Sequence, residues 1–228
     1  MIGVYDYTVI LTYLSAISAC IGVMVSLSNT GHPYLGVFFL LICGLCDAFD
    51  GKVASTKKNR TDMMKKFGVQ IDSLSDLVAF GVLPVAIGNA MIKVSDIYSD
   101  ILTKDSPKFN VITAIFLFGI LILYFLAALI RLAYYNVTEE ERQKTETGSR
   151  KIYEGLPVTS ASLIFPSVIL LQYLTEMDVT IVYFIVMAMM AVAFVSRIKI
   201  PKPGIKVILG LVALGVLELI ALIVFGFN

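Results

Sequence analysis

The sequence has few of the side chains that soluble enzymes often use for chemistry: one His, three Cys and 15% charged residues among 228. His32 stands alone in a short turn, and we expect it to have no catalytic part. Zinc sites usually draw on His or Cys. Cys43-x-x-Cys46 lacks further soft ligands and a thioredoxin-like context, so we expect its cysteines to pack as small apolar side chains. Without a suitable His, a carboxylate is the default candidate for a general base.

The sequence also lacks a low-complexity tract, a short repeat and a linker long enough to separate two domains. The first residues show neither the basic start nor the small-residue cleavage site of a removable signal. We therefore expect one integral-membrane domain over residues 1–228, with its first helix near the N-terminus.

Long apolar runs are abundant: 58% of the residues are hydrophobic and the mean hydropathy is +0.87. A membrane-spanning helix needs roughly 20 apolar residues, and in lipid a helix satisfies its own backbone hydrogen bonds. The expected fold is therefore all-α, a polytopic membrane helical bundle. The candidate helices lie at about 8–28, 34–54, 66–91, 110–136, 157–175, 179–197 and 204–226.

The distribution of basic residues predicts the topology. Of 18 Lys and Arg residues, fourteen lie in three alternate connections, 52–66, 142–151 and 197–206, and three lie in 93–108. The positive-inside rule places the three richer connections and the N-terminus in the cytoplasm of a cell-membrane protein. For most of these residues topology is their whole role, and no nucleic-acid partner is expected.

One polar pattern interrupts the apolar runs. It reads Asp47-x-x-Asp50-Gly51-x-x-Ala54, then Gly68-x-x-x-Asp72-x-x-x-Asp76. Residues three or four apart share one face of an α-helix, so each half of the pattern lines one face. If the two faces meet, four carboxylates converge. Charged groups beside hydrocarbon are costly and persist where something compensates them.

A carboxylate-only ligand set suits Mg²⁺ or Mn²⁺, and Ca²⁺ less specifically. Magnesium in proteins commonly also binds substrate phosphates, so the pattern indicates a phosphate-bearing substrate. The small residues would let a ligand approach the helices closely. The alternative is that they serve helix packing alone. For the aspartates the alternative is a solvated helix end or pairing with lysines, which fits Asp62 better than Asp47 or Asp50.

The whole pattern resembles that of the CDP-alcohol phosphatidyltransferases, and the resemblance covers roughly residues 5–197, a six-helix core. Residues 204–226 would then be an additional C-terminal helix, in which we assign no role to Glu218. The resemblance implies a membrane enzyme that transfers the phosphatidyl group of a CDP-linked lipid to an alcohol and releases CMP. It also implies a homodimer.

The resemblance further implies roles for individual residues. Asp47, Asp50 and Asp72 would be the main ligands of two metal ions. Asp76 would be a further ligand and the general base. The cytidine of the CDP-lipid would lie over Gly51, Ala54 and Gly68.

The sequence departs from the family pattern in two places. Ser55 replaces the Arg that in the family helps to hold the nucleotide phosphates. The segment from Ser55 to Gly68 is also four residues longer than usual, so the two faces would still meet if this segment stays helical. Ser55, Lys57 and Lys58 are our candidates for contacts to the CDP-lipid, and Arg60 is a further possible substitute.

Three more segments resemble the phosphatidylserine synthase branch: Phe67–Pro84, Arg131–Asn136 and Tyr153–Pro157. They imply L-serine as the acceptor, with CDP-diacylglycerol or CDP-archaeol as the lipid donor. The planar fork of Arg131 suits the serine carboxylate, and Tyr135 and Asn136 can add hydrogen bonds. For Arg131 the alternative is a structural ion pair or snorkelling to the interface.

Two other functions stay open at this point. The acceptor could be another polar alcohol, such as glycerol phosphate or inositol phosphate, although Arg131 is the only cation more than three residues from the end of a predicted helix. The aspartates could instead form the transport site of a divalent-cation transporter. Against a transporter, they lie near one membrane face, with no second cluster and no inverted repeat.

Overall fold

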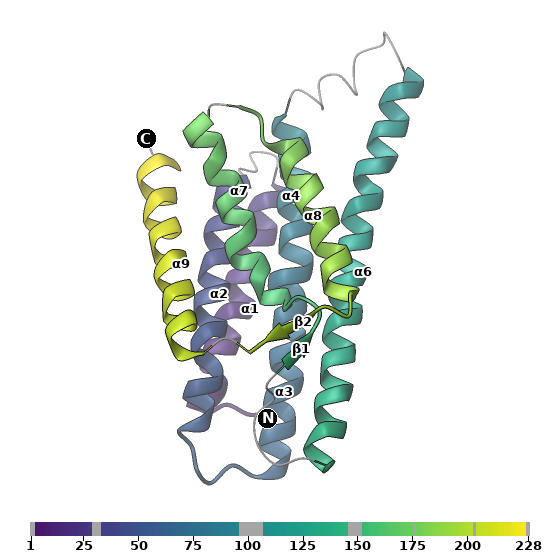
Figure 1. Cartoon of the computed structure of the whole chain (residues 1–228). Coiled ribbons are helices and arrows are strands. Elements are labelled where there is room, and N and C mark those ends of the chain that lie inside the picture. Colours follow the sequence, from purple (N-terminus) through teal and green to yellow (C-terminus); the bar gives the residue numbers. More distant parts are fainter. Residues whose placement is uncertain are drawn as a thin grey trace.

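The computed structural model describes residues 3–28, 33–95, 107–145, 152–175, 177–202 and 204–226, so His32 lies outside the described residues. Long helices that alternate in direction form the bundle (Figure 1). The all-α prediction is therefore confirmed. In chain order the elements are η1 (Tyr7–Val9), α1 (Ile10–Leu27), α2 (Pro33–Ser55), α3 (Asp62–Asp76), η2 (Leu77–Val82), α4 (Leu83–Val94), α6 (Pro107–Thr145), β1 (Ile152–Glu154), η3 (Val158–Ser160), α7 (Ala161–Thr175), α8 (Thr180–Val195), β2 (Lys199–Pro201) and α9 (Ile205–Gly226).

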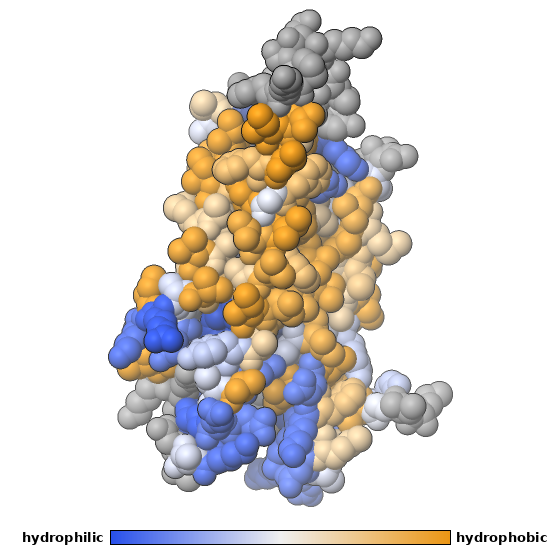
Figure 2. Space-filling view, turned by 90° about the vertical axis from the view of Figure 1, so that its right-hand side faces the viewer, coloured by the Kyte–Doolittle hydropathy of each residue, from blue (hydrophilic) through white to orange (hydrophobic). Residues whose placement is uncertain are grey.

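Within the part of the chain that the structure describes, five helical stretches are long and apolar enough to cross a membrane: Tyr7–Leu27, Pro33–Ser55, Asp62–Val94, Val111–Thr145 and Lys206–Val224. Two shorter apolar helices, Val158–Gln172 and Thr180–Val195, complete the bundle. On the face that Figure 2 shows, apolar side chains cover most of the length of the bundle and polar side chains gather mainly at one end. We call this the polar end; it contains the connection between α2 and α3. These features confirm an integral membrane protein.

Buried aromatic side chains pack the centre of the bundle. Tyr124 of α6 contacts Phe165 of α7 and Phe194 of α8, with ring centroids 5.6 and 5.5 Å apart. The ring of Phe165 lies 4.6 Å from that of Tyr183 on α8. All four side chains are essentially inaccessible to solvent. This packing joins α6, α7 and α8 into one rigid wall, because core side chains interdigitate at close to crystal density.

A π-helical segment, η2, interrupts the long helix that begins with α3 and ends with α4. Pro84 has no N–H to donate to the carbonyl of Phe80, four residues earlier. The hydroxyl of the buried Tyr124 donates to that carbonyl instead, at 2.7 Å, and Tyr183 donates to the Pro84 carbonyl at 2.8 Å. Two tyrosines thus hold the segment that immediately follows Asp76.

A short antiparallel pairing of β1 with β2 crosses the bundle near its polar end (Figure 1). The chain turns after β1 at Gly155, whose φ is +76°. A Cβ there would lie 2.7 Å from the carbonyl oxygen of Phe194, so a side chain would be excluded by space as well as by conformation. The turn brings the start of α7 against the end of α8.

Two helix boundaries differ from the predicted ranges: α3 begins at Asp62 and not at about 66, and α6 ends at Thr145 and not at about 136. The segment after Ser55 does not stay helical: α2 ends there, and Thr61 begins α3 by accepting a hydrogen bond from the Met64 N–H at 3.3 Å. The extra residues therefore form a connecting loop. Helix α6 runs on to Thr145, with Arg142 paired to Glu139, so part of the predicted 142–151 loop is helical.

Candidate metal and substrate site

Three carboxylates meet where the end of α2 faces α3. Asp47 and Asp50 lie one turn apart on α2, and Asp72 lies on α3. One carboxylate oxygen from each can be chosen so that all three lie within 4.8 Å of one another. The three side chains are half-buried. The predicted meeting of the two helix faces is therefore present, although the connection between them is a loop.

The chemistry of this cluster fits a divalent cation. None of the four aspartates takes part in a salt bridge with any residue that the structure describes. Carboxylates held this close repel one another unless a cation or a shared proton compensates them. Hard oxygen ligands from two rigid helices are a set that Mg²⁺ and Mn²⁺ accept. Asp47, Asp50 and Asp72 can therefore hold a metal ion.

Asp76 lies one helical turn beyond Asp72 and outside this triad. It lines the same cavity as the three other aspartates. The π-helical segment η2 begins at the next residue. Asp76 is therefore positioned by the last turn of α3 and by the tyrosines that hold η2.

A cavity of about 1160 Å³ contains the four aspartates and continues between helices α2, α7 and α9. Its ionic end carries the aspartates with Arg131, Tyr135 and Tyr153. Its other part, which we call the apolar arm, is formed mainly by α7 and α9. Residues that line the apolar arm include Leu163, Ile164, Val207, Ile208, Leu211, Val212, Leu214 and Gly215. The cavity as a whole is thus shaped for an amphipathic molecule.

The three small residues of the pattern have different surroundings. Gly51 lines the cavity, and a Cβ built there would have no atom within 4 Å. Ala54 is half-buried and does not line the cavity. Gly68 is covered by the guanidinium of Arg60, whose Nη2 would lie 2.7 Å from a Cβ at Gly68. Of the three, only Gly51 faces open space in the cavity.

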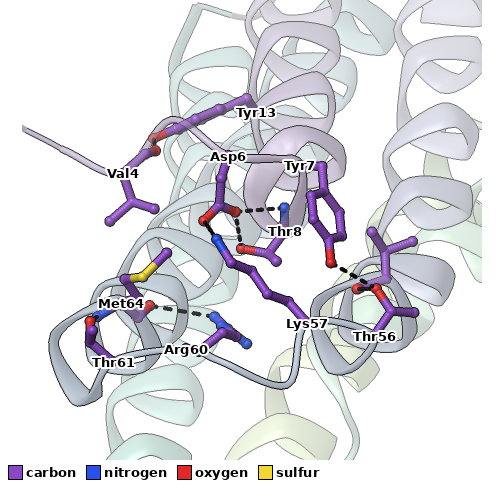
Figure 3. Close-up of polar contacts among 11 residues, drawn as sticks. Val4, Asp6, Tyr7, Thr8, Tyr13, Thr56, Lys57, Arg60, Thr61 and Met64 are labelled. Carbon is purple, nitrogen blue, oxygen red and sulfur yellow. Dashed lines mark hydrogen bonds and ion pairs between the residues drawn. The ribbon is translucent and has the colours of Figure 1, made fainter.

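The predicted cations of the α2–α3 loop do not reach the cavity. Lys57 pairs with Asp6 at 2.8 Å, and the Tyr7 hydroxyl accepts from Thr56 at 3.4 Å (Figure 3). Hydrogen bonds from Lys57 and Thr8 lower the pKa of the Asp6 carboxyl to about 2.

Ser55 and Lys58, the other two candidates beside Lys57, are exposed. The Ser55 hydroxyl donates to the carbonyl of Lys52 in its own helix. None of the three lines the cavity. Lys52 does, and its ammonium lies over the ring of Phe49.

Arg131 is a buried cation at the ionic end of the cavity, with 6% of the residue exposed. Its Nε donates to the Leu156 carbonyl at 3.3 Å, and its guanidinium lies 5.4 Å from the ring centre of Tyr135. The rings of Tyr135 and Tyr153 are 6.0 Å apart. These three side chains form a cationic and aromatic wall of the cavity that the carboxylates of α2 and α3 also line.

Asn136 lies beside this wall without lining the cavity. Its Nδ2 donates to the Ser73 hydroxyl at 2.8 Å, and that hydroxyl lies 3.2 Å from its Oδ1. Residues 131 and 135 are one turn apart and share a face, whereas residue 136 is turned away. Asn136 therefore connects α6 to α3.

The cavity has other lining residues that sequence reasoning did not identify: Tyr153, Thr159, Ser160, Ser162 and Lys202. They come from β1, the start of α7 and the end of β2. The turn residues Tyr153-x-Gly155-Leu156-Pro157 were a signal for part of this group. The pairing of β1 with β2, which brings Lys202 to the cavity, has no local signal because the partners are far apart in sequence.

A family model for CDP-alcohol phosphatidyltransferase matches residues 8–227 and therefore includes α9. Among curated proteins, the chain is 33% identical over 156 residues to CDP-diacylglycerol–serine O-phosphatidyltransferase of Saccharomyces cerevisiae, covering 67% of this chain and 48% of that protein. It is 28% identical over 193 residues to archaetidylserine synthase of Methanothermobacter thermautotrophicus, covering 85% and 68%. A CDP-diacylglycerol–serine O-phosphatidyltransferase of Helicobacter pylori is 26% identical over 192 residues, covering 82% and 70%. The matched region is thus about half the length of the yeast relative.

Proposed function

This chain belongs to the CDP-alcohol phosphatidyltransferase family, and from that membership we propose that it transfers the phosphatidyl or archaetidyl group of a CDP-linked lipid to the hydroxyl of L-serine, releasing CMP. The observation that carries this proposal is the single cavity that joins the aspartates to the apolar arm. The diphosphate of a CDP-lipid suits the ionic end of this cavity, and its hydrocarbon chains suit the apolar arm. The serine synthases among its relatives support serine as acceptor.

Asp47, Asp50 and Asp72 are the proposed ligands of two divalent ions, Mg²⁺ or Mn²⁺. When bound, such ions neutralise the diphosphate and stabilise CMP as a leaving group. By holding these ions at the helix ends, the carboxylates would position the diphosphate at the cavity's ionic end. We place the cytidine along the helix faces of Gly51, Ala54 and Gly68, with the guanidinium of Arg60 between the nucleotide and Gly68. The open space in front of Gly51 supports this placement.

Asp76 is the proposed general base, and it can also serve as a further metal ligand. The serine oxygen forms a bond to the lipid-side phosphorus, the bond from that phosphorus to the CMP oxygen breaks, and the hydroxyl proton passes to Asp76. Its place in the cavity one turn from the triad supports this role, because a base must reach the attacking hydroxyl without being buried in the metal cluster. A single displacement accounts for these roles.

Arg131 and Tyr135 are the proposed acceptor-binding residues. The guanidinium fork suits the serine carboxylate, and the tyrosine ring holds the guanidinium from one side. Asn136 is the third predicted residue, and we now propose that it acts through Ser73 by holding α6 against α3.

We further propose that the polar end faces the cytoplasm, because the basic residues concentrate in the connections at that end. The donor lipid is CDP-diacylglycerol or CDP-archaeol, since both present the same phosphates. As in the family resemblance, the working form would be a homodimer. The mass of the detergent-solubilised protein by light scattering tests the dimer.

The first test of this function is serine-dependent CMP release by the purified protein in detergent, supplied with a CDP-lipid and Mg²⁺ or Mn²⁺. We expect release that requires both serine and metal and stops on adding a chelator. Release with glycerol phosphate or inositol phosphate but not with serine would keep the family reaction and refute the acceptor. No release with any alcohol, in protein that still binds Mn²⁺, would favour a cation transporter.

A further inference from the structure

The guanidinium of Arg60 covers Gly68, a position of the nucleotide pattern. The space in front of Gly68 is filled by Nη2 of Arg60, which a Cβ at this position would approach to 2.7 Å. Arg60 comes from the α2–α3 loop, the segment that is longer here than in the family pattern. A cation from this loop therefore occupies the helix face that the pattern reserves for the nucleotide.

The loop that carries Arg60 is held in place by the N-terminal segment. Asp6 accepts hydrogen bonds from Thr8 and from the ammonium of Lys57 (Figure 3). At the other end of the loop, Thr61 caps α3. The ammonium of Lys57 is thus paired with Asp6 of the N-terminal segment. Arg60, between these two anchors, is left as the loop cation that lies against α3.

Arg60 has donors that the protein does not satisfy. Its only hydrogen bond among the described residues is a long one, 3.4 Å from Nη2 to the Met64 carbonyl. Its Nε is buried without a partner, and it makes no salt bridge with any described residue. A guanidinium is always charged, and buried polar groups are ordinarily paired. The surroundings of Arg60 thus lack an anion.

The position of Arg60 against α3 indicates which group of the substrate could be the missing anion. Gly68 lies one turn before Asp72 on the same face of α3, a rise of about 6 Å along the axis. Neither Arg60 nor Gly68 lines the cavity of the aspartates, but a diphosphate that is held at the carboxylates and extends one turn along α3 would bring its cytidine-side phosphate toward Gly68. We propose that Arg60 binds this phosphate, first in the CDP-lipid and then in CMP, and so takes the part of the arginine that Ser55 replaces. This inference rests on the proposed function.

The test is metal-dependent binding of CMP to the purified full-length protein, measured by calorimetry with Mn²⁺ present. Losing a charge-assisted hydrogen bond to phosphate should weaken CMP binding roughly ten- to hundredfold in Arg60→Ala. Cytidine, which lacks the phosphate, should bind Arg60→Ala and wild type equally. Lys66→Ala is the matched control, because Lys66 is an exposed cation two residues from Gly68 and points elsewhere. It should bind CMP like wild type.

Two further variants separate a phosphate contact from a structural role. Arg60→Lys should retain part of the CMP affinity and an unchanged KM for serine. Gly68→Ala should displace the guanidinium, so its effect and that of Arg60→Ala on CMP affinity should be less than additive. The inference about Arg60 would be overturned if Arg60→Ala bound CMP as tightly as wild type, or if it lost affinity for cytidine and CMP equally. The proposed function would still stand in that case, provided that wild type released CMP in a serine-dependent reaction. Wild-type protein that binds no CMP with Mn²⁺ would overturn both.

Discussion

The two parts of the cavity are built on different principles. The ionic end places four carboxylates and one buried arginine at fixed positions on α2, α3 and α6. The apolar arm is lined by interchangeable aliphatic side chains of α7 and α9. Substitutions in the first part change the charge and geometry of single groups, whereas those in the second change volume. We therefore expect the ionic end to control chemistry and the arm to control which lipid fits.

The largest effect should follow from Asp50→Asn, which removes a proposed metal ligand of the ionic end. Metal-ion stabilisation is worth several kcal/mol, so turnover should fall by about 10³-fold or more. Metal-dependent CMP binding should fall with it. Turnover and Mn²⁺-dependent CMP affinity measure the two effects. Full CMP affinity in this variant would remove Asp50 from the metal site.

Asp76→Asn should separate chemistry from binding within the same end of the cavity. General-base catalysis contributes typically 10²–10⁴-fold, so turnover should fall by about that factor. CMP and CDP-lipid affinity should stay close to wild type. Comparing turnover with CMP binding in this variant and in Asp50→Asn checks the assignment. An equal loss of CMP binding in both would refute Asp76 as the base.

Arg131→Lys should affect only the acceptor. A lysine keeps the charge and loses the planar fork, so the KM for serine should rise roughly tenfold to a hundredfold. CMP affinity should be unchanged. Steady-state kinetics with serine and CDP-lipid varied in turn measure this. A rise in the KM for the CDP-lipid instead would place Arg131 in the donor site.

Val212→Trp should narrow the apolar arm. Activity with a long-chain CDP-lipid should fall severalfold, because overpacking a cavity costs about 1–3 kcal/mol, and activity with a short-chain CDP-lipid should be nearly unchanged. Leu209→Trp is the matched control, since Leu209 is on the same helix, is 55% exposed and does not line the cavity. Equal loss with both lipids in Val212→Trp would show that the arm does not hold the chains.

The smallest effect should come from Asp6→Asn, outside the cavity. The pKa of Asp6 is lowered from 3.8 to about 2 in the fold, so its pairing with Lys57 stabilises the protein above pH 4, and that contribution is lost as the pH falls through about 2. Wild type should unfold at a slightly higher temperature than Asp6→Asn at pH 7, and the difference should shrink toward pH 2. Glu140→Gln, which breaks an exposed pair with Lys144, serves as comparison. A difference that grows with acid would contradict the pairing.

The sequence was sufficient to predict the helices and the meeting of the aspartates, because both depend on local periodicity. Asp47, Asp50 and Asp72 converge since the 3.6-residue repeat fixes their faces before any tertiary contact forms. Arg131 and Tyr135 were predicted instead from the resemblance of residues 131–136 to the phosphatidylserine synthase branch.

Other parts depended on contacts that no local pattern encodes. The connection after Ser55 was predicted without its contacts, and Lys57 in it pairs with Asp6, some fifty positions earlier in the chain. Lys202 reaches the cavity through the pairing of β1 with β2. Asn136 is one position beyond the face of Arg131, and its bond to Ser73 emerges only from packing.

The π-helical segment η2 sets the rotation between the two halves of the continuous helical stretch Asp62–Val94. Each residue advances an α-helix by about 100°. The widened turn of η2 therefore rotates the side chains of α3 about the helix axis relative to those of α4. The half with Asp72 and Asp76 can turn toward the carboxylates of α2, while the half with Ile87 and Met91 turns toward the core. Deleting one residue within Leu77–Val82 would leave the composition, the hydropathy and the helix almost intact. It would nevertheless rotate Asp72 and Asp76 away from the carboxylates of α2.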